Sequence, residues 1–361
     1  MGKHGVKILI GILVVLILIA GGVLAYKITQ DKKETSEASN EPEGNDVLVA
    51  EVKEKEIQTF KGNDRPIAVM IDNHNQAWAQ AGLNKAYMVY EIIVEGGETR
   101  LMALFKGVDV DQIGPVRSSR HYFLDYAMEN DAIYVHFGWS PQAKKDISKY
   151  SIHNINGLSE DGTTFWRTKE KSAPHNAMTN TEKILQSAKN KNYRTTSDKE
   201  SVLQYSADEI NLENAQSATS VTIPHSELQT VKYEYDSVNK VYKRYARGVE
   251  QKDFNTNEPI TTKNIIITKC ANGDISDSDE KGRQELENIG EFDGYYITNG
   301  KAIQIKCTKN ARDEQTVYKD LQGNEIKVND GNTWINICPP NANIVIEGQE
   351  NTQTTNTTNI Q

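Results

Sequence analysis

The sequence predicts an α+β protein, with an N-terminal mixed α/β-sheet domain at residues 64–215 and a smaller, mainly antiparallel β-rich domain at residues 216–348. Two changes of pattern along the chain predict this class. From Pro66 to about Ala188, short apolar runs alternate with helical patterns, which is typical of a sheet covered by helices. From about Val221 to Ile346, short runs rich in Thr, Val and Tyr are separated by turn residues, as in antiparallel strands.

Four apolar runs are the strand candidates of the first domain, at residues 66–72, 87–94, 100–106 and 132–137. Several of them are apolar on both faces, so we expect central strands that are buried on both sides. Residues 95–98, with the sequence Glu-Gly-Gly-Glu, separate two of these runs. This spacing predicts a hairpin in which a glycine adopts a positive φ.

Residues 115–128 have a helical pattern that begins with a proline, a common first residue of helices. At about 100° per residue, Arg117, Arg120 and His121 share one face of such a helix. Three aromatic residues lie nearly opposite, and we expect them to pack on the sheet: Tyr122, Phe123 and Tyr126.

Two features stand out in the second domain. An acidic, helix-like insert at residues 277–288 interrupts the strands. The three cysteines, Cys270, Cys307 and Cys338, form no CxxC pair, so neither a zinc knuckle nor a thioredoxin-like site is indicated. We expect them to be small buried hydrophobic residues, with a disulfide between Cys307 and one of the other two as the alternative.

The N-terminal residues 8–26 are apolar or small throughout, and at about 1.5 Å per residue they span a hydrocarbon core of roughly 30 Å. Lys3 and Lys7 precede this segment, which predicts a cytoplasmic N-terminus and extracytoplasmic domains. We therefore expect a single-pass anchor in the cell membrane at residues 1–26. Cleavage after Ala25 as a signal peptide, which would secrete the protein, is the alternative. The polar composition predicts a disordered linker at 27–63 and a disordered tail at 349–361.

The formal net charge of −9 argues against nucleic acid as a partner, because neutralising phosphates requires a basic face. No G-x-S-x-G, Walker A, Rossmann, H-x-H or H-E-x-x-H pattern occurs, so we expect no cofactor and no metal site.

Two arginines at a predicted helix start indicate a site for carboxylate or phosphate, since free N–H groups and guanidinium forks both bind anions. Pairing of these arginines with acidic residues such as Glu91, Glu95 or Glu98 is the alternative. The predicted ligand-binding residues are Arg117, Arg120, His121, Glu91, Arg100 and Asn73.

Four residues are candidates for acid–base catalysis: Asp72, Glu95, His136 and His175. Asp72 ends a predicted strand, where ligand crevices of α/β sheets usually lie, and His175 lies in a predicted loop. The alternative is a salt bridge to Arg100, Arg117 or Arg120 for the carboxylates. For His136, within an apolar strand, the alternative is a hydrogen-bonded core residue.

Several runs together resemble the YerB-like family of bacterial lipoproteins: RPIAVMIDNH, YEIIVEGGETRLMALF, IGPVRSSRHYF, IYVHFGWSPQA, FWR, APHN, GKAIQI and DGNTWINI. The resemblance covers roughly residues 60–346. It implies an α/β region followed by a β-rich region, and it implies no reaction, because the family has no established activity. The chain departs from the family in lacking a lipidated cysteine after its apolar segment, so we expect a peptide anchor.

The function we expect is that of a membrane-anchored, extracytoplasmic envelope protein. It would bind an anionic envelope polymer, a small ligand or a protein partner through its arginines, histidines and carboxylates, without catalysis. An envelope hydrolase or transferase that uses Asp72, Glu95, His136 or His175, and a protein–protein scaffold, are the alternatives.

Overall fold

The computed structural model describes residues 55–276 and 281–348. The predicted anchor, the tail at 349–361 and most of the predicted linker lie outside the described residues. Within the described part of the chain, no helix is both long and apolar enough to cross a membrane.

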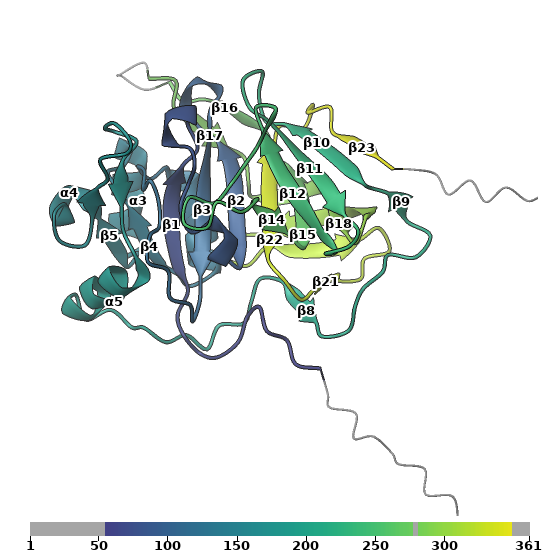
Figure 1. The fold of residues 1–361 in the computed structure, drawn as a ribbon, viewed down its shortest axis with the longest axis horizontal. Coiled ribbons are helices and arrows are strands. Elements are labelled where there is room, and N and C mark those ends of the chain that lie inside the picture. Colours follow the sequence, from purple (N-terminus) through teal and green to yellow (C-terminus); the bar gives the residue numbers. More distant parts are fainter. Residues whose placement is uncertain (1–54, 277–280, 349–361) are drawn as a thin grey trace, which may run out of the picture. The chain divides into compact units, whose positions relative to one another are not determined.

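One mixed sheet of eleven strands runs through the fold (Figure 1). Its central strands come from both predicted domains. In order, the strands are β20 (Val317–Asp320), β19 (Lys301–Lys309), β18 (Gly290–Thr298), β15 (Asn264–Lys269), β22 (Thr333–Cys338), β2 (Met88–Ile93), β3 (Thr99–Phe105), β1 (Ile67–Asp72), β4 (Ile133–His136) and β5 (Asn154–Asn156), and β9 (Gln216–Ser217) pairs with β19.

The expected central strands are confirmed, since every residue of β1, β2 and β3 is buried. Alternate side chains enter two separate hydrophobic clusters. Val69 belongs to the cluster that contains the second sheet and α5, and Met70 belongs to the cluster that contains α2. The hairpin between β2 and β3 is also confirmed, with Gly96 and Gly97 at positive φ.

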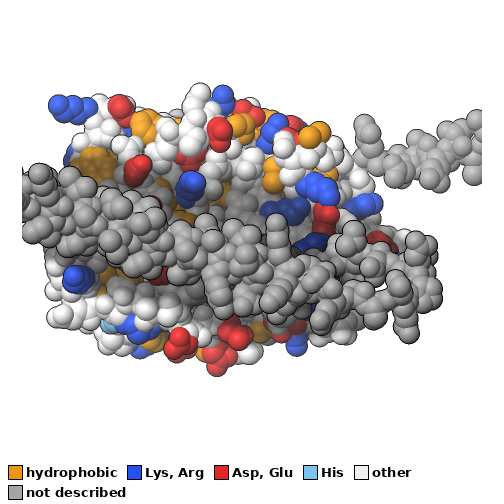
Figure 2. All heavy atoms as spheres, turned by 60° about the horizontal axis from the view of Figure 1, so that its bottom comes forward, with side chains coloured by type: hydrophobic (Ala, Val, Ile, Leu, Met, Phe, Trp, Pro, Cys, Tyr) orange, Lys and Arg blue, Asp and Glu red, His pale blue; other side chains and the backbone are white. Residues whose placement is uncertain are grey.

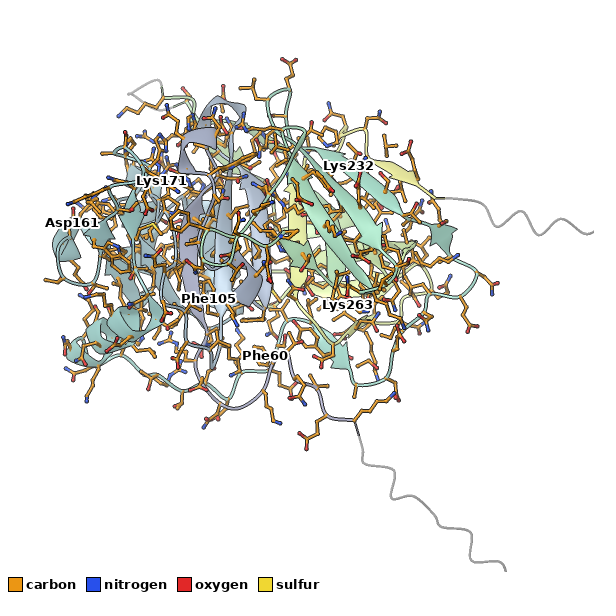
Figure 3. The ribbon with its side chains drawn as sticks, in the orientation of Figure 1. Phe60, Phe105, Asp161, Lys171, Lys232 and Lys263 are labelled. Atoms are coloured by element: carbon orange, nitrogen blue, oxygen red, sulfur yellow. The ribbon has the colours of Figure 1, made fainter. Side chains whose placement is uncertain are left out.

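A second sheet, of six strands, packs on one face of the large sheet. Its strands are β13 (Val249–Glu250), β12 (Val241–Ala246), β11 (Thr230–Asp236), β10 (Ser220–Pro224), β23 (Val345–Glu347) and β14 (Thr261–Thr262). Tyr233 on β11 contacts Trp334 on β22, with ring centroids 6.5 Å apart. Figure 3 shows Lys232 on this sheet and Asp161 at the opposite end of the described fold.

Four α-helices and three short pairs of strands are the remaining α-helices and strands of the described residues. The helices are α2 (His121–Glu129), α3 (Pro141–Lys149), α4 (Gly157–Glu160) and α5 (Thr181–Asn190), and the pairs are β16 (Asn272–Asp274) with β17 (Gln284–Leu286), β8 (Gln204–Ser206) with β21 (Lys327–Asn329), and β6 (Trp166–Arg167) with β7 (Ala177–Met178). Three 3₁₀ turns lie at Asn75–Ala77, Leu83–Lys85 and Glu95–Gly97. Ser140 and Asn180 cap α3 and α5 by accepting backbone N–H groups, as their side chains favour.

The predicted helix start at Pro115 is wrong, because α2 begins at His121. Residues 115–117 are instead extended beside the end of β1: Asp72 N donates to Pro115 O at 2.8 Å, and Arg117 N donates to Met70 O at 2.9 Å. The partner strand β4 pairs only with residues 67–69 of β1. The extended segment therefore satisfies backbone groups that β4 leaves unpaired. The aromatic face of α2 does pack on the sheet, as expected.

The two predicted domains share the large sheet. Strand β22 lies between β2 and β15 and is parallel to both, so the division at residues 215 and 216 does not separate two sheets. The predicted linker also ends earlier than expected. Gln58 N and Thr59 N donate to the carboxylate of Asp330, and the ring of Phe60 contacts that of Tyr87.

Within the predicted helical insert, residues 284–286 form strand β17, and residues 277–280 lie outside the described part. The three cysteines are buried and unpaired, as expected. Burial raises the pKa of the Cys307 thiol to about 12, which keeps it protonated and unreactive.

Candidate functional site

A cavity of about 410 Å³ opens where β1 ends and β3 begins. Asp72, the last residue of β1, lies opposite Arg100 of β3 in the antiparallel register, so the sheet itself places a carboxylate beside a guanidinium. The lining contains five cationic side chains (Arg100, Arg117, Arg120, Lys281 and Arg283), three carboxylates (Asp72, Glu95 and Glu98) and two imidazoles (His74 and His175). A site of this size can hold a small molecule.

Asp72 and His175 form a buried pair at the bottom of the cavity. The distance from His175 Nδ1 to Asp72 Oδ2 is 2.7 Å, and the other carboxylate oxygen accepts the backbone N–H of His74 at 3.1 Å. Because an ionised carboxylate can only accept, His175 Nδ1 must carry the hydrogen. A neutral His175 therefore has its lone pair on Nε2.

His74 fixes the plane of the His175 ring. The two imidazoles are stacked, with centroids 4.6 Å apart and planes 16° from parallel. His74 Nδ1 accepts the backbone N–H of Gln76 at 3.2 Å, which holds His74 over its neighbour. The stacking and the bond to Asp72 together leave His175 little rotational freedom.

Arg117 reaches the same carboxylate from the extended segment beside β1. Its Nε lies 3.1 Å from Asp72 Oδ2, an ionic contact without hydrogen-bond geometry. The side chain is 28% exposed, so its terminal nitrogens remain accessible from the cavity.

Arg120 is paired by the acidic residue that the sequence offered as an alternative. Its Nε and Nη2 donate to the two oxygens of Glu95, at 2.5 and 2.8 Å. Burial alone would raise the pKa of Glu95, but Arg120 and the nearby Arg100 outweigh it and lower that pKa. This fork-to-fork pair forms a neutral wall of the cavity.

Arg100 is in a different electrostatic situation. It is 7% exposed and donates Nη1 to Ser118 O at 2.7 Å, and among the described residues no carboxylate pairs with it. Burial and the like charges of Arg120 and Arg117 lower its pKa to about 10, although Asp72 and Glu95 oppose this. The positive charge of Arg100 is thus incompletely balanced.

Glu91 and Asn73, both predicted to bind ligand, are absent from the cavity lining and bond instead to Thr99, which is part of it. Glu91 Oε1 accepts hydrogen bonds from Thr99 Oγ1 at 2.7 Å and from Asn73 Nδ2 at 3.2 Å. Its other oxygen pairs with Arg244 Nη2 at 2.5 Å, and both side chains are fully buried. The burial would raise the pKa of Glu91, but Arg244 and the hydrogen bonds lower it. Glu91 is therefore an ionised support of the cavity floor.

Two predicted histidines are absent from the cavity lining. His136 is a core residue: its Nδ1 lies 2.7 Å from Gly138 O, its Nε2 lies 3.2 Å from Asn154 Oδ1, and burial lowers its pKa. His121 Nε2 lies 2.9 Å from Glu285 Oε1 on β17. The shared helical face that would have joined His121 to the arginines does not exist, because the helix starts at His121.

Both the sequence and the fold of this chain match those of known proteins. Residues 53–194 match the model described as "Protein of unknown function (DUF3048) N-terminal domain", and residues 221–335 match that of the DUF3048 C-terminal domain. The chain belongs to the DUF3048 family. It is 32% identical over 286 residues to "Putative lipoprotein YerB" of Bacillus subtilis (strain 168), covering 76% of this chain and 81% of that protein. The crystal structure of YerB from Bacillus subtilis matches with a TM-score of 0.69 and 32% identity, over 78% of this chain and 94% of that chain. The predicted resemblance is confirmed.

Sequence reasoning missed Arg244, the residue of this DUF3048 chain that balances Glu91. A signal was present, because alternation along β12 places Tyr242, Arg244 and Ala246 on the same, buried face. A charged residue at an inward position requires a buried partner. Thr99 was also missed, and His74 was considered only as a metal ligand together with Asp72; their contacts with Glu91 and His175 join residues that are distant along the chain.

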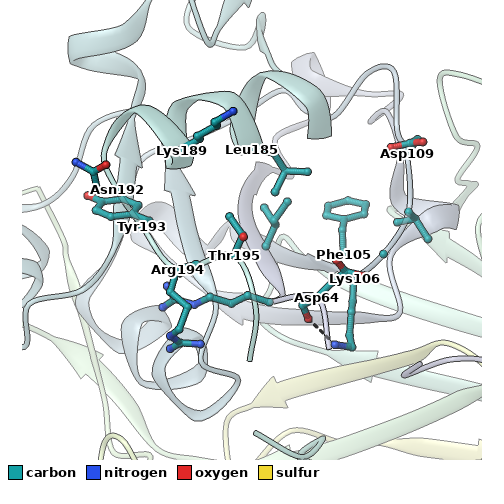
Figure 4. Close-up of a pocket in the computed structure, with 14 residues that line it drawn as sticks. Asp64, Phe105, Lys106, Asp109, Leu185, Lys189, Asn192, Tyr193, Arg194 and Thr195 are labelled. Carbon is teal, nitrogen blue, oxygen red and sulfur yellow. Dashed lines mark hydrogen bonds between the residues drawn. The ribbon is translucent and has the colours of Figure 1, made fainter. Parts of the chain in front are cut away.

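A larger cavity, of about 890 Å³, lies beside α5 and is shown in Figure 4. Three of its basic side chains, those of Arg65, Lys106 and Arg194, are engaged by the protein itself. Arg65 donates to the backbone oxygens of Asp131 and Arg194, and Lys106 donates to the backbone oxygen of Asp64, the dashed contact in Figure 4. Among the described residues, no group of three His, Cys, Asp or Glu side chains is arranged to hold a metal ion. The smaller cavity at the end of β1 is therefore the better candidate site.

Proposed function

We propose that this chain is an extracytoplasmic envelope protein that binds an anionic ligand in the cavity at the end of β1. The single observation that supports the ligand is Arg100, a buried guanidinium on the cavity wall without a carboxylate partner among the described residues. A buried cation is costly unless it is paired. A bound anion would supply the missing partner.

The charge of the cavity lining supports the same proposal. The guanidiniums of Arg100 and Arg117 both line the cavity, and Arg117 is one of the like charges that lower the pKa of Arg100. Arg117 adds accessible terminal nitrogens next to Arg100. A carboxylate or phosphate could accept from both guanidiniums, and such charge-assisted bonds are the stronger kind.

The envelope location is supported by the N-terminal sequence. Residues 8–26 are long enough to span a membrane, and lysines precede them. The first cysteine of the chain is Cys270, which is buried in the fold, so no cysteine next to the apolar segment could carry a lipid. The relative from Bacillus subtilis is named a lipoprotein, whereas for this chain we propose attachment to the membrane through a peptide span.

The test is a thermal unfolding series of the full chain in detergent, with inorganic phosphate, sulfate or succinate added. A bound anion should raise the unfolding midpoint, because a ligand at 10 times its Kd stabilises the folded state by about 1.4 kcal/mol. Arg100→Gln should abolish the shift, whereas Arg167→Gln, at an exposed ion pair outside the cavity, should retain it. A shift that survives Arg100→Gln would refute the proposed site.

A further inference from the structure

His175 has the features of a general base. Asp72 holds the hydrogen on Nδ1, so the lone pair of neutral His175 is on Nε2. Nε2 has no hydrogen-bond partner among the described residues, and it is not among the fully enclosed polar atoms. Since His175 lines the cavity, this nitrogen is open to water or to a ligand there. A carboxylate that selects the tautomer and orients the ring is the arrangement that makes an imidazole an effective base.

The cations are placed next to this base. Oδ2 of Asp72 contacts both His175 Nδ1, at 2.7 Å, and Arg117 Nε, at 3.1 Å. One carboxylate oxygen therefore brings the imidazole and the guanidinium together, and Arg100 lies opposite Asp72 in the sheet register. An anionic group bound by the two arginines would lie beside His175.

A phosphate group fits these cations better than a carboxylate does. Two guanidiniums present more donors than the two oxygens of a carboxylate can satisfy, whereas a phosphate ester offers up to three non-bridging oxygens. Phosphoryl transfer also depends mainly on positioning and on stabilising charge, which are the two functions that arginines serve. Nothing in this arrangement requires a nucleophilic serine or cysteine.

We propose that the cavity hydrolyses a phosphoric ester, with His175 as the catalytic base and Asp72 as a positioning residue. This rests on the proposed anion site. His175 Nε2 takes a proton from a water molecule as the water oxygen bonds to phosphorus. The ester P–O bond breaks, the leaving alkoxide takes a proton from a solvent water molecule, and His175 returns its proton to the hydroxide that this leaves. The products are an alcohol and a phosphate, with no change of oxidation state and no further reactant.

The experiment measures p-nitrophenol release by the full chain from p-nitrophenyl phosphate and from bis(p-nitrophenyl) phosphate. The first probe tests monoesters and the second tests diesters. His175→Gln should lower kcat by about 100-fold or more, the range of general-base catalysis, and should keep the phosphate-induced shift in unfolding midpoint. Asp72→Asn should lower kcat with little change in KM, because an amide no longer selects the Nδ1–H tautomer.

The matched control is His121→Gln, which removes another histidine that pairs with a carboxylate, but outside the cavity lining. This variant should keep the wild-type rate. If neither ester is hydrolysed while phosphate still raises the midpoint, hydrolysis is refuted and anion binding stands. If phosphate gives no shift, the proposed function fails as well. Unchanged turnover in His175→Gln would assign the activity to something other than this base.

Discussion

Buried charged residues in this chain differ in how they are neutralised. Arg244 pairs with Glu91, and Lys309 pairs with Glu129, all four of them nearly or completely inaccessible to solvent. Arg100 is almost as deeply buried, yet a backbone carbonyl is its only direct acceptor among the described residues. A pair that is internally balanced maintains the fold. The unbalanced cation at the cavity wall is the observation on which the proposed anion binding rests.

This difference predicts that replacing arginine with methionine has different effects on the free energy of unfolding at the two positions. Arg244→Met leaves Glu91 buried without its cation and should lower the free energy of unfolding by about 3–5 kcal/mol. Arg100→Met removes an unbalanced charge, so without ligand it should leave that free energy unchanged or raise it by up to about 4 kcal/mol. Urea unfolding of both variants would measure this. Equal destabilisation would mean that Arg100 serves the fold alone.

Six of the residues that the sequence singled out lie together in the structure, and their ligand-binding or catalytic roles stay predictions. Asp72, Glu95, Arg100, Arg117, Arg120 and His175 were named from the sequence, and all line one cavity. Their roles were less accessible. Arg120 and Arg117 cannot be told apart by their sequence context. Of the two, Arg120 donates two hydrogen bonds to one carboxylate, from Nε and Nη2, because the β2–β3 hairpin brings Glu95 against it. Pairing of this kind is decided by contacts that are distant along the chain.

At the scale of elements, the segment between β3 and α2 shows the limit of local pattern. A proline followed by a helical period is compatible with a helix start, and it is equally compatible with an extended run that ends at a helix. The extended form occurs because residues 115–117 hydrogen-bond to backbone groups at the end of β1 that β4 leaves unpaired. The extended conformation also places the side chain of Arg117 beside that of Asp72. The apolar strands β1, β2 and β3, in contrast, required only their own sequence.

Arg312 ties the two helices α2 and α3 to the loop between β19 and β20. It donates to Asp125 on α2 and to Asp146 on α3, each at 2.7 Å. Asp125 is buried, and this burial raises its pKa to about 6 even though Arg312 and Asn288 oppose the rise. Folded Asp125 therefore binds a proton at pH values where the unfolded chain, with a pKa of about 3.9, has lost it.

The raised pKa of Asp125 predicts the direction in which the stability of the fold changes with pH. The contribution of Asp125 to stability is complete below about pH 4 and is lost as the pH rises through about 6, amounting to up to about 3 kcal/mol. Asp125→Asn should lack this component. The difference in free energy of unfolding between wild type and variant, measured by urea titration from pH 4 to 7.5, should shift against the wild type as the pH rises. A constant difference would contradict the prediction.

At the scale of the molecule, a chain with a net charge of −9 contains a cavity whose lining includes the guanidiniums of Arg100 and Arg117. On the face shown in Figure 2, acidic and basic side chains are interspersed among the described residues that are visible. The positive charge of the site therefore acts at short range, since salt screens fields beyond about 10 Å. The prediction of two domains did not anticipate the shared sheet, because the pairing of β22 with β2 joins residues far apart in sequence.

The mode of membrane attachment is testable on the whole chain. The full chain should remain in the membrane fraction after a high-salt wash, and deletion of residues 1–26 should release it. Cys270→Ser should stay attached, because we expect a peptide span and no lipid. N-terminal sequencing of the mature protein provides the check: a chain that begins at Tyr26 would show cleavage after Ala25 and would contradict the anchor.

The central position of β22 has a consequence for how the protein is made. Until β22 has been synthesised as far as Cys338, β2 has a partner on one side only and exposes a row of unpaired backbone groups. The early part of the chain is therefore an incomplete sheet that can pair with other chains. A premature stop before residue 333 would produce an aggregating fragment, so the two halves must be produced, and must mature, as one unit.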